Sequence, residues 1–235
     1  MKYEFSGRIR YSEIAENGRL SIPGLVNYFQ DVSTFQSEDL GVGMGYLKER
    51  HTAWILSFWQ IVIERLPLLG ETVTAQTWPY EFKGFFGLRN FTLLDQERRM
   101  LAKANSVWVL FDTEKQRPGK PEPEMKERYE LEEKLDMEYA PRKLAAPEGG
   151  VKEEPVYIDR HHLDTNHHVN NGQYIVIAAA YLPEGFAIHQ MKAEYCMQAR
   201  LHDEIIPRVC REDGRVTVAL ENAQGKPYAV VEFDA

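Results

Sequence analysis

Apolar residues follow two different spacings in the first forty residues. Residues 3–11 alternate between apolar and polar positions, which is typical of a strand. The next apolar positions are three or four residues apart: Ile22, Leu25, Val26, Phe29 and Val32. This spacing predicts a helix over residues 21–38. Ser21 is suited to cap it, Pro23 is tolerated in its first turn, and Gly41 lies just beyond its end.

Strand-like segments follow this helix at residues 53–64, 71–81, 85–95 and 100–113. Between them lie Pro67, Gly70, Gly84 and the polar stretch 95–99, which are typical of turns. The pattern then changes over residues 114–154, where charges alternate, prolines recur, and apolar periodicity fades apart from a short predicted helix at 125–138. We interpret 114–154 as a linker.

The same order of elements recurs after the linker. The predicted strand at 155–159 and the helix at 170–182, ended by Pro183, are followed by strands at 187–200, 203–211, 215–221 and 227–233. Asp213-Gly214 is a hairpin turn signal. The repeat predicts an α+β protein with two copies of a hotdog unit, each a long helix wrapped by an antiparallel sheet. The predicted tandem has one unit at 1–113 and one at 155–235.

Composition excludes several classes of protein. The formal net charge of −8 argues against a nucleic-acid binder, and no apolar run approaches the roughly 18 residues of a membrane span. Two cysteines and a polar start do not indicate secretion. We therefore expect a cytoplasmic protein that does not bind to a membrane. An acidic protein partner needs a basic patch, and the sequence offers four candidates for it: Arg89, Arg98, Arg99 and Lys103.

The densest polar cluster is HHLDTNHHVNN at residues 161–171, just before the second predicted helix. A helix N-terminus favours a developing oxyanion, and imidazole, carboxylate and carboxamide groups can orient a water molecule against a thioester carbonyl. The alternative is purely structural. Asp164, Asn166 and Asn170 are also typical residues for capping a turn and a helix, with solvated histidines around them.

The cluster also resembles a known motif. Asp-x-Asn-x-His-Val-Asn-Asn followed by Tyr174 is similar to the catalytic motif of the acyl-ACP thioesterases, a plant and bacterial double-hotdog family that ends fatty-acid synthesis. Further stretches resemble the bacterial members in family order: RYSEIAENGRLSIPGLVNYFQD, DLGVG, WQIVIERLPLLGETVTAQTWPY, FKGFFGLRNF, SVWVLFD and AEYCMQA. The resemblance implies an N-terminal unit that shapes the acyl pocket and a C-terminal unit that carries the catalytic motif.

The resemblance also implies roles for individual residues. His168 and Asn166 position water and thioester, and Asp164 orients them, whereas His161, His162 and His167 fall outside the motif. The family has an acidic residue four positions after a Glu-Tyr pair, here Glu194-Tyr195, and Gln198 occupies that position. A carboxamide hydrogen-bonds water but does not take its proton.

Three accounts of this departure are open: His168 or Asp164 is the base, Glu194 assists, or the enzyme is weakened. Alternation along the predicted strand 187–200 puts Glu194, Cys196 and Gln198 on one mostly polar face, so Glu194 is a candidate neighbour of Gln198. The structural alternative is a solvated strand face.

Other kinds of site are less well supported. A cysteine nucleophile would be Cys196, but the plant enzymes carry their cysteine where Ala199 stands here, so we interpret Cys196 and Cys210 as buried, inert thiols. Adjacent histidines in the cluster have poor geometry for a metal. Residues 41–45, GVGMG, lack the lysine and the strand-to-helix context of a phosphate loop and predict a plain loop.

The resemblance thus implies hydrolysis of fatty acyl-ACP to free fatty acid and ACP, with acyl carrier protein as partner and without a cofactor or metal. An acyl-CoA thioesterase and a non-catalytic acyl-carrier or lipid-binding double hotdog are the alternatives. Gln198 favours the non-catalytic protein, and the set of Asp164, Asn166 and His168 opposes it. The pairing of two hotdogs in one chain is compatible with a monomer or a homodimer.

Overall fold

The computed structural model describes residues 2–147, 149–164 and 166–235. The chain divides into two compact units, one of Met1–Ser57 with Ile63–Tyr139 and one of Phe58–Val62 with Ala140–Ala235. Within the described residues, no helix has the length and apolar character needed to cross a membrane.

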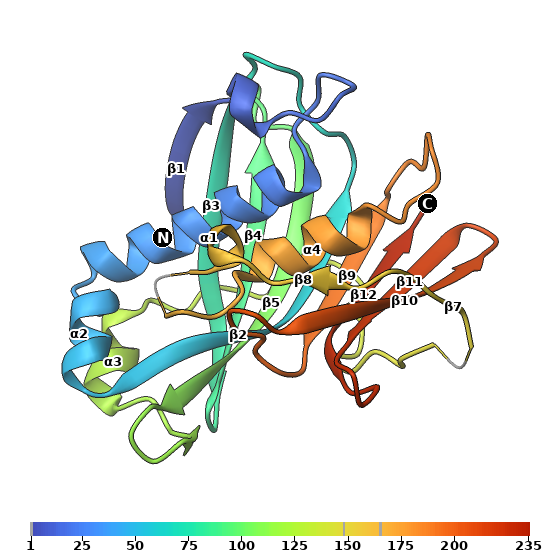
Figure 1. The fold of residues 1–235 in the computed structure, drawn as a ribbon. Coiled ribbons are helices and arrows are strands. Elements are labelled where there is room, and N and C mark those ends of the chain that lie inside the picture. Colours follow the sequence, from blue (N-terminus) through green and yellow to red (C-terminus); the bar gives the residue numbers. More distant parts are fainter. Residues whose placement is uncertain (1, 148, 165) are drawn as a thin grey trace. The chain divides into compact units, whose positions relative to one another are not determined.

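The first unit is an antiparallel sheet with one long helix across a face (Figure 1). The strand order is β1-β3-β4-β5-β2. The strands are β1 (Tyr3–Arg8), β2 (Thr52–Ile63), β3 (Thr72–Lys83), β4 (Phe86–Leu94), β5 (Met100–Asp112) and the short β6 (Arg117–Pro118), which pairs with β5. The helices are α1 (Ile22–Asp39), α2 (Met44–Glu49) and α3 (Pro123–Arg128), with a 3₁₀ turn at Tyr11–Glu13.

The local signals at α1 explain where it begins and ends. The Ser21 hydroxyl accepts a hydrogen bond from the Gly24 N–H at 3.1 Å, so it caps the first turn. The helix ends at Asp39 with Leu40 as its C-cap, and Gly41 follows with a φ of 68°, a conformation that glycine adopts without strain. Leu25 and Phe29 are fully buried against the sheet. The predicted helix and its caps are confirmed.

The second unit repeats this plan with a shorter helix. Its strand order is β9-β12-β11-β10-β7, residues Phe58–Val62 of β2 pair with β9, and β8 pairs with β10. The strands are β7 (Val151–Lys152), β8 (Val156–Tyr157), β9 (Gln190–Tyr195), β10 (Glu204–Glu212), β11 (Arg215–Glu221) and β12 (Pro227–Asp234). Helix α4 (Asn171–Ala179) contacts β11 and β12, and a 3₁₀ turn covers Arg160–His162. Gly214, with a φ of 69°, sits in the predicted hairpin between β10 and β11.

Four element predictions need correction. Strand β9 stops at Tyr195 instead of 200, because the N–H groups of Cys196 and Met197 both bond the Tyr228 carbonyl, which turns the chain out of the ladder. Helix α4 ends at Ala179 and passes into turns before Pro183. The helix predicted at 125–138 is confined to Pro123–Arg128. Residues 44 and 45 of the predicted glycine loop begin α2.

The charged, proline-containing stretch up to residue 139 is packed onto the first unit. Met125 and Tyr129 are buried in a cluster with Val42 and Leu110. The hydroxyls of Tyr129 and Ser37 are 2.8 Å apart and hydrogen-bonded. This charged stretch therefore contains a few apolar residues that anchor it to the unit, and the periodicity of the sequence does not indicate them.

Candidate active site

Asp164 closes the turn that contains the three candidate catalytic residues. Its Oδ1 accepts hydrogen bonds from the backbone N–H of Asn166 at 2.8 Å and of His168 at 3.2 Å. Its own N–H donates to the His168 carbonyl at 2.8 Å. His167 has a φ of 61°, in the left-handed region. These hydrogen bonds therefore hold Asp164, Asn166 and His168 in one turn, with Asn166 exposed and the other two half-buried.

Backbone contacts fix this turn against the segment that follows β9. His168 forms an antiparallel bridge with Arg200, and the Val169 N–H donates to the Ala199 carbonyl at 2.9 Å. The Ala199 N–H in turn donates to the hydroxyl of Tyr174, a buried residue of α4, at 2.9 Å. Helix, turn and post-β9 segment are thus joined around His168.

The structural interpretation of the cluster holds for part of it. Asn170 caps α4, since its Oδ1 accepts from the Gly172 N–H at 2.8 Å. Asp164 uses one carboxylate oxygen in the turn. The helix cap and the candidate catalytic residues are therefore successive parts of one segment, and the two interpretations do not exclude each other.

The surroundings of His168 favour its neutral form. Burial lowers the pKa of the His168 imidazole below its ordinary 6.5, and the charges of Arg200 and His167 lower it further, against the opposing carboxylate of Asp164. A neutral imidazole at neutral pH is able to accept a proton. His162 has a lowered pKa too, mainly through burial, but its Nδ1 is occupied by the Asp159 N–H at 3.0 Å.

Gln198 lies next to the turn along the chain but outside the strand predicted to carry it. It is exposed and immediately precedes Ala199, whose carbonyl bonds Val169. Because β9 stops at Tyr195, the predicted alternation of Glu194, Cys196 and Gln198 on one strand face is wrong. In the described part of the chain, no hydrogen bond joins the Gln198 side chain to the turn.

Glu194 is committed elsewhere in the second unit. It is buried, and its Oε2 accepts a hydrogen bond from the Leu144 N–H at 2.8 Å. The prediction of a solvated strand face is therefore wrong at this position. A buried carboxylate of this kind needs its hydrogen bonds, and Glu194 obtains at least one of them from the backbone.

The thiols do not have the character of nucleophiles. Desolvation of the thiol and the neighbouring Glu194 carboxylate raise the pKa of Cys196 to about 11, which disfavours the reactive thiolate. Cys196 is exposed as a residue and Cys210 is half-buried, so the prediction that both are buried is wrong. Over the described ranges, no three His, Cys, Asp or Glu side chains form a group able to hold a metal.

Three of the four candidates for a basic patch in the first unit are buried or paired with acidic residues. Arg89 is buried and hydrogen-bonds Gln36 and Thr77. Arg98 pairs with Glu4 at 2.6 Å, and Arg99 pairs with Asp95 at 2.7 Å. Sequence reasoning did not single out Arg200, which becomes a neighbour of His168 only through the bridge between two distant loops. No spacing along the chain signals that contact.

Comparison with solved structures defines the class of fold. An acyl-ACP thioesterase from Bacteroides thetaiotaomicron superimposes with a TM-score of 0.90 and 21% identity, covering 98% of this chain and 96% of that one. The 12:0-ACP thioesterase from Umbellularia californica gives a TM-score of 0.86 with 18% identity, covering 99% and 96% of the two chains. The predicted α+β tandem hotdog fold is confirmed.

Sequence comparison defines the family. Residues 1–129 match the model of the acyl-ACP thioesterase N-terminal domain, and the chain belongs to the acyl-ACP thioesterase family. A chloroplastic palmitoyl-acyl carrier protein thioesterase from Gossypium hirsutum is 27% identical over 208 residues, 80% of this chain and 49% of its own. A chloroplastic acyl-[acyl-carrier-protein] hydrolase from Cuphea viscosissima is 28% identical over 188 residues, 74% of this chain and 45% of its own. The chain thus spans about half the length of these curated relatives.

Proposed function

We propose that the protein hydrolyses the thioester of fatty acyl-ACP to free fatty acid and ACP and so terminates fatty-acid synthesis. The observation that carries this proposal is the turn that holds His168 beside Asp164 and Asn166 at the start of α4. The lowered pKa of His168 supports a role as proton acceptor. Membership of the family supports the substrate class.

The proposed reaction needs one water molecule and one base. His168 takes a proton from water as the water oxygen attacks the carbonyl carbon, and Asn166 positions the thioester. The C–S bond then breaks, and the proton passes to the thiolate of the carrier. The products are a fatty acid and a free carrier thiol. Asp164 holds the turn and orients His168.

This assignment makes Gln198 a positioning group at most. A carboxamide donates or accepts a hydrogen bond but does not remove a proton from water. The Gln198→Glu variant tests this directly. An unchanged rate supports His168 as the base, and a raised rate shows that a carboxylate adds to the mechanism at this position.

The proposal is tested with purified protein, acyl-ACP and acyl-CoA of several chain lengths, and release of free thiol over time. We expect turnover of acyl-ACP, with His168→Ala at least about 100-fold slower because the base is lost. His189→Ala is the matched control, since His189 is an exposed histidine of the same unit outside the turn. Retained acyl binding without turnover of any thioester would instead support the non-catalytic alternative that Gln198 suggests.

The same assay separates the two carriers. A preference for acyl-CoA over acyl-ACP would make the protein an acyl-CoA thioesterase, which differs only in the carrier recognised. The compartment stays a prediction: we propose a cytoplasmic enzyme, whereas the plant relatives are named chloroplastic.

A further inference from the structure

Two arginines and two histidines lie beside the candidate site without an acidic partner among the residues that the structure describes. Arg160, His161, Arg200 and His202 are all exposed, and none of their side chains forms an ion pair with another residue that the structure describes. We call these four residues the cationic rim. Two other arginines of the same unit do have acidic partners: Arg208 pairs with Glu221, and Arg215 pairs with Asp234.

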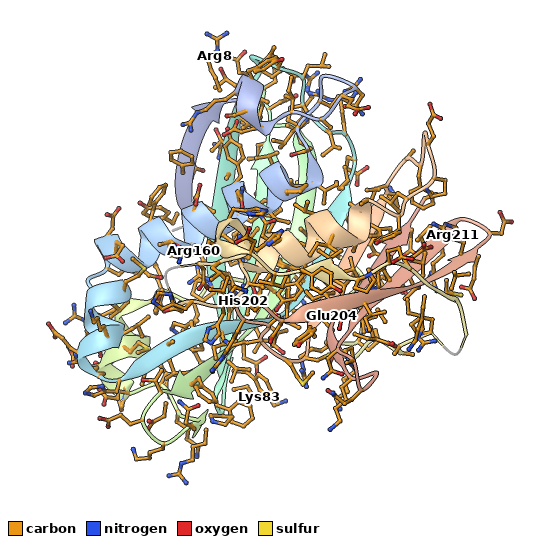
Figure 2. All side chains as sticks on the ribbon, in the orientation of Figure 1. Arg8, Lys83, Arg160, His202, Glu204 and Arg211 are labelled. Carbon is orange, nitrogen blue, oxygen red and sulfur yellow. The ribbon has the colours of Figure 1, made fainter. Side chains whose placement is uncertain are left out.

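Two loops bring the cationic rim together. The Ile158 N–H donates to the Asp203 carbonyl at 2.9 Å, and the His202 N–H donates to the Ile158 carbonyl at 3.0 Å. The bridge between His168 and Arg200 joins the same loops at a second point. Arg200 therefore lies next to His168, and the backbone contacts of Ile158 bring the loop that carries Arg160 beside the loop that carries His202; both residues are labelled in Figure 2.

Two acidic residues of these loops, Asp159 and Asp203, accept hydrogen bonds from backbone N–H groups. Asp159 Oδ1 accepts from the Arg160 N–H at 2.6 Å. Asp203 Oδ2 accepts from the Arg200 N–H at 2.8 Å and from the Tyr228 hydroxyl at 3.3 Å. These carboxylates shape the loops, so the guanidinium and imidazole groups are left to bind an anion from outside. A protein with a formal net charge of −8 keeps this local cationic surface beside its candidate active site.

We propose that the cationic rim binds the phosphodiester of the phosphopantetheine arm that carries the acyl group. The inference rests on the proposed function and concerns the phosphate of the substrate, which does not take part in the bond cleavage. A guanidinium binds phosphate oxygens through two parallel N–H donors, and imidazole N–H groups add further donors. Holding the phosphate along the rim fixes how far the arm reaches, and this places the thioester at His168.

The test compares two substrates that differ only in the phosphate. Acyl-pantetheine and acyl-4′-phosphopantetheine with the same acyl chain are hydrolysed by the wild type and by an Arg160→Met, Arg200→Met double variant. We expect the wild type to favour the phosphorylated substrate about tenfold in kcat/KM, as for a charge-assisted contact. In the double variant the ratio falls to near one. Because Arg200 also affects His168, the ratio is the readout, and changes common to both substrates cancel.

Arg211→Met is the matched control. Arg211 is an exposed arginine of β10 in the same unit, bonded to the Tyr181 carbonyl, and Figure 2 shows it well away from Arg160 and His202. This variant removes one arginine charge from the same unit, whereas the double variant removes two, and it should keep the wild-type substrate ratio. An equal fall in both variants would indicate a general charge effect and overturn the proposal.

A binding measurement separates this inference from the proposed function. Calorimetry measures the affinity of the protein for phosphopantetheine and for pantetheine. It needs no turnover, so it tests the cationic rim even if the protein hydrolyses no thioester. Tighter binding of the phosphorylated molecule, lost in the double variant, is the expected result. Equal affinity of the two molecules for the wild type would overturn the rim, whereas absent turnover alone contradicts only the proposed hydrolysis.

Discussion

At the scale of single residues, Asp164 determines the shape of its loop as well as the charge around His168. One of its oxygens accepts two backbone N–H groups, and its own N–H closes the turn on the His168 carbonyl. The motif could be found from the sequence because Asp164, Asn166 and His168 lie within five positions of one another. The backbone hydrogen bonds that make Asp164 a turn-forming residue can be recognised only in the structure.

A pair of substitutions separates the two roles of Asp164. Asp164→Ala removes the acceptor, so we expect it to lower the free energy of unfolding by about 1 kcal/mol and to lose turnover. Asp164→Asn keeps an acceptor oxygen without the charge, so stability should change much less while turnover still falls. Urea unfolding and thiol release measure both effects. An alanine variant as stable as the wild type would show that the turn does not need this side chain.

The pH dependence of turnover reports on His168. Because burial and then the Arg200 and His167 charges hold the pKa of His168 below 6.5, the neutral imidazole persists to lower pH than in an exposed histidine. We expect kcat/KM to stay level near neutrality and to fall on the acid side below pH 6.5. Arg200→Met removes one cause of the lowering, so the acid limb should move to higher pH. A limb that begins above 6.5 in the wild type, or that moves to lower pH in the variant, is incompatible with His168 as the base.

At the scale of elements, α4 is joined to the segment after β9 through one hydroxyl. Tyr174 accepts the Ala199 N–H at 2.9 Å, and both residues are buried. Tyr174→Phe leaves that N–H without its acceptor, so we expect a loss of about 1–3 kcal/mol in the free energy of unfolding. Tyr181→Phe is the control, because the Tyr181 hydroxyl bonds no other residue in the described part of the chain. Equal free energies of unfolding for the two variants would show that the hydrogen bond between Tyr174 and Ala199 does not stabilise the fold.

Elements with local signals were predictable, and those ended by distant contacts were not. Helix α1 has its apolar spacing, its Ser21 cap and its terminal Gly41 within one stretch of sequence. The end of β9 depends on the Tyr228 carbonyl, which lies on another strand, and so the predicted strand ran too far. The placement of Gln198 on a strand face was wrong for the same reason.

At the scale of the whole molecule, the tandem order of elements was predictable although the two halves share little sequence. Strand, helix and four strands occur in both units, and this order is independent of residue identity. The charge pattern was not predictable at this scale. Arg89 is buried, and Arg98 and Arg99 pair with acidic residues. Arg160 and Arg200 are exposed, form no ion pair with the residues that the structure describes, and come from loops that the fold brings together.

The most direct measurement for the central claim is the release of free fatty acid from acyl-ACP by the wild type, His168→Ala and His189→Ala side by side. The account predicts release by the wild type and by His189→Ala at similar rates, with release by His168→Ala reduced at least about 100-fold while its fold is kept. A His168→Ala variant that releases fatty acid at the rate of the wild type would contradict it.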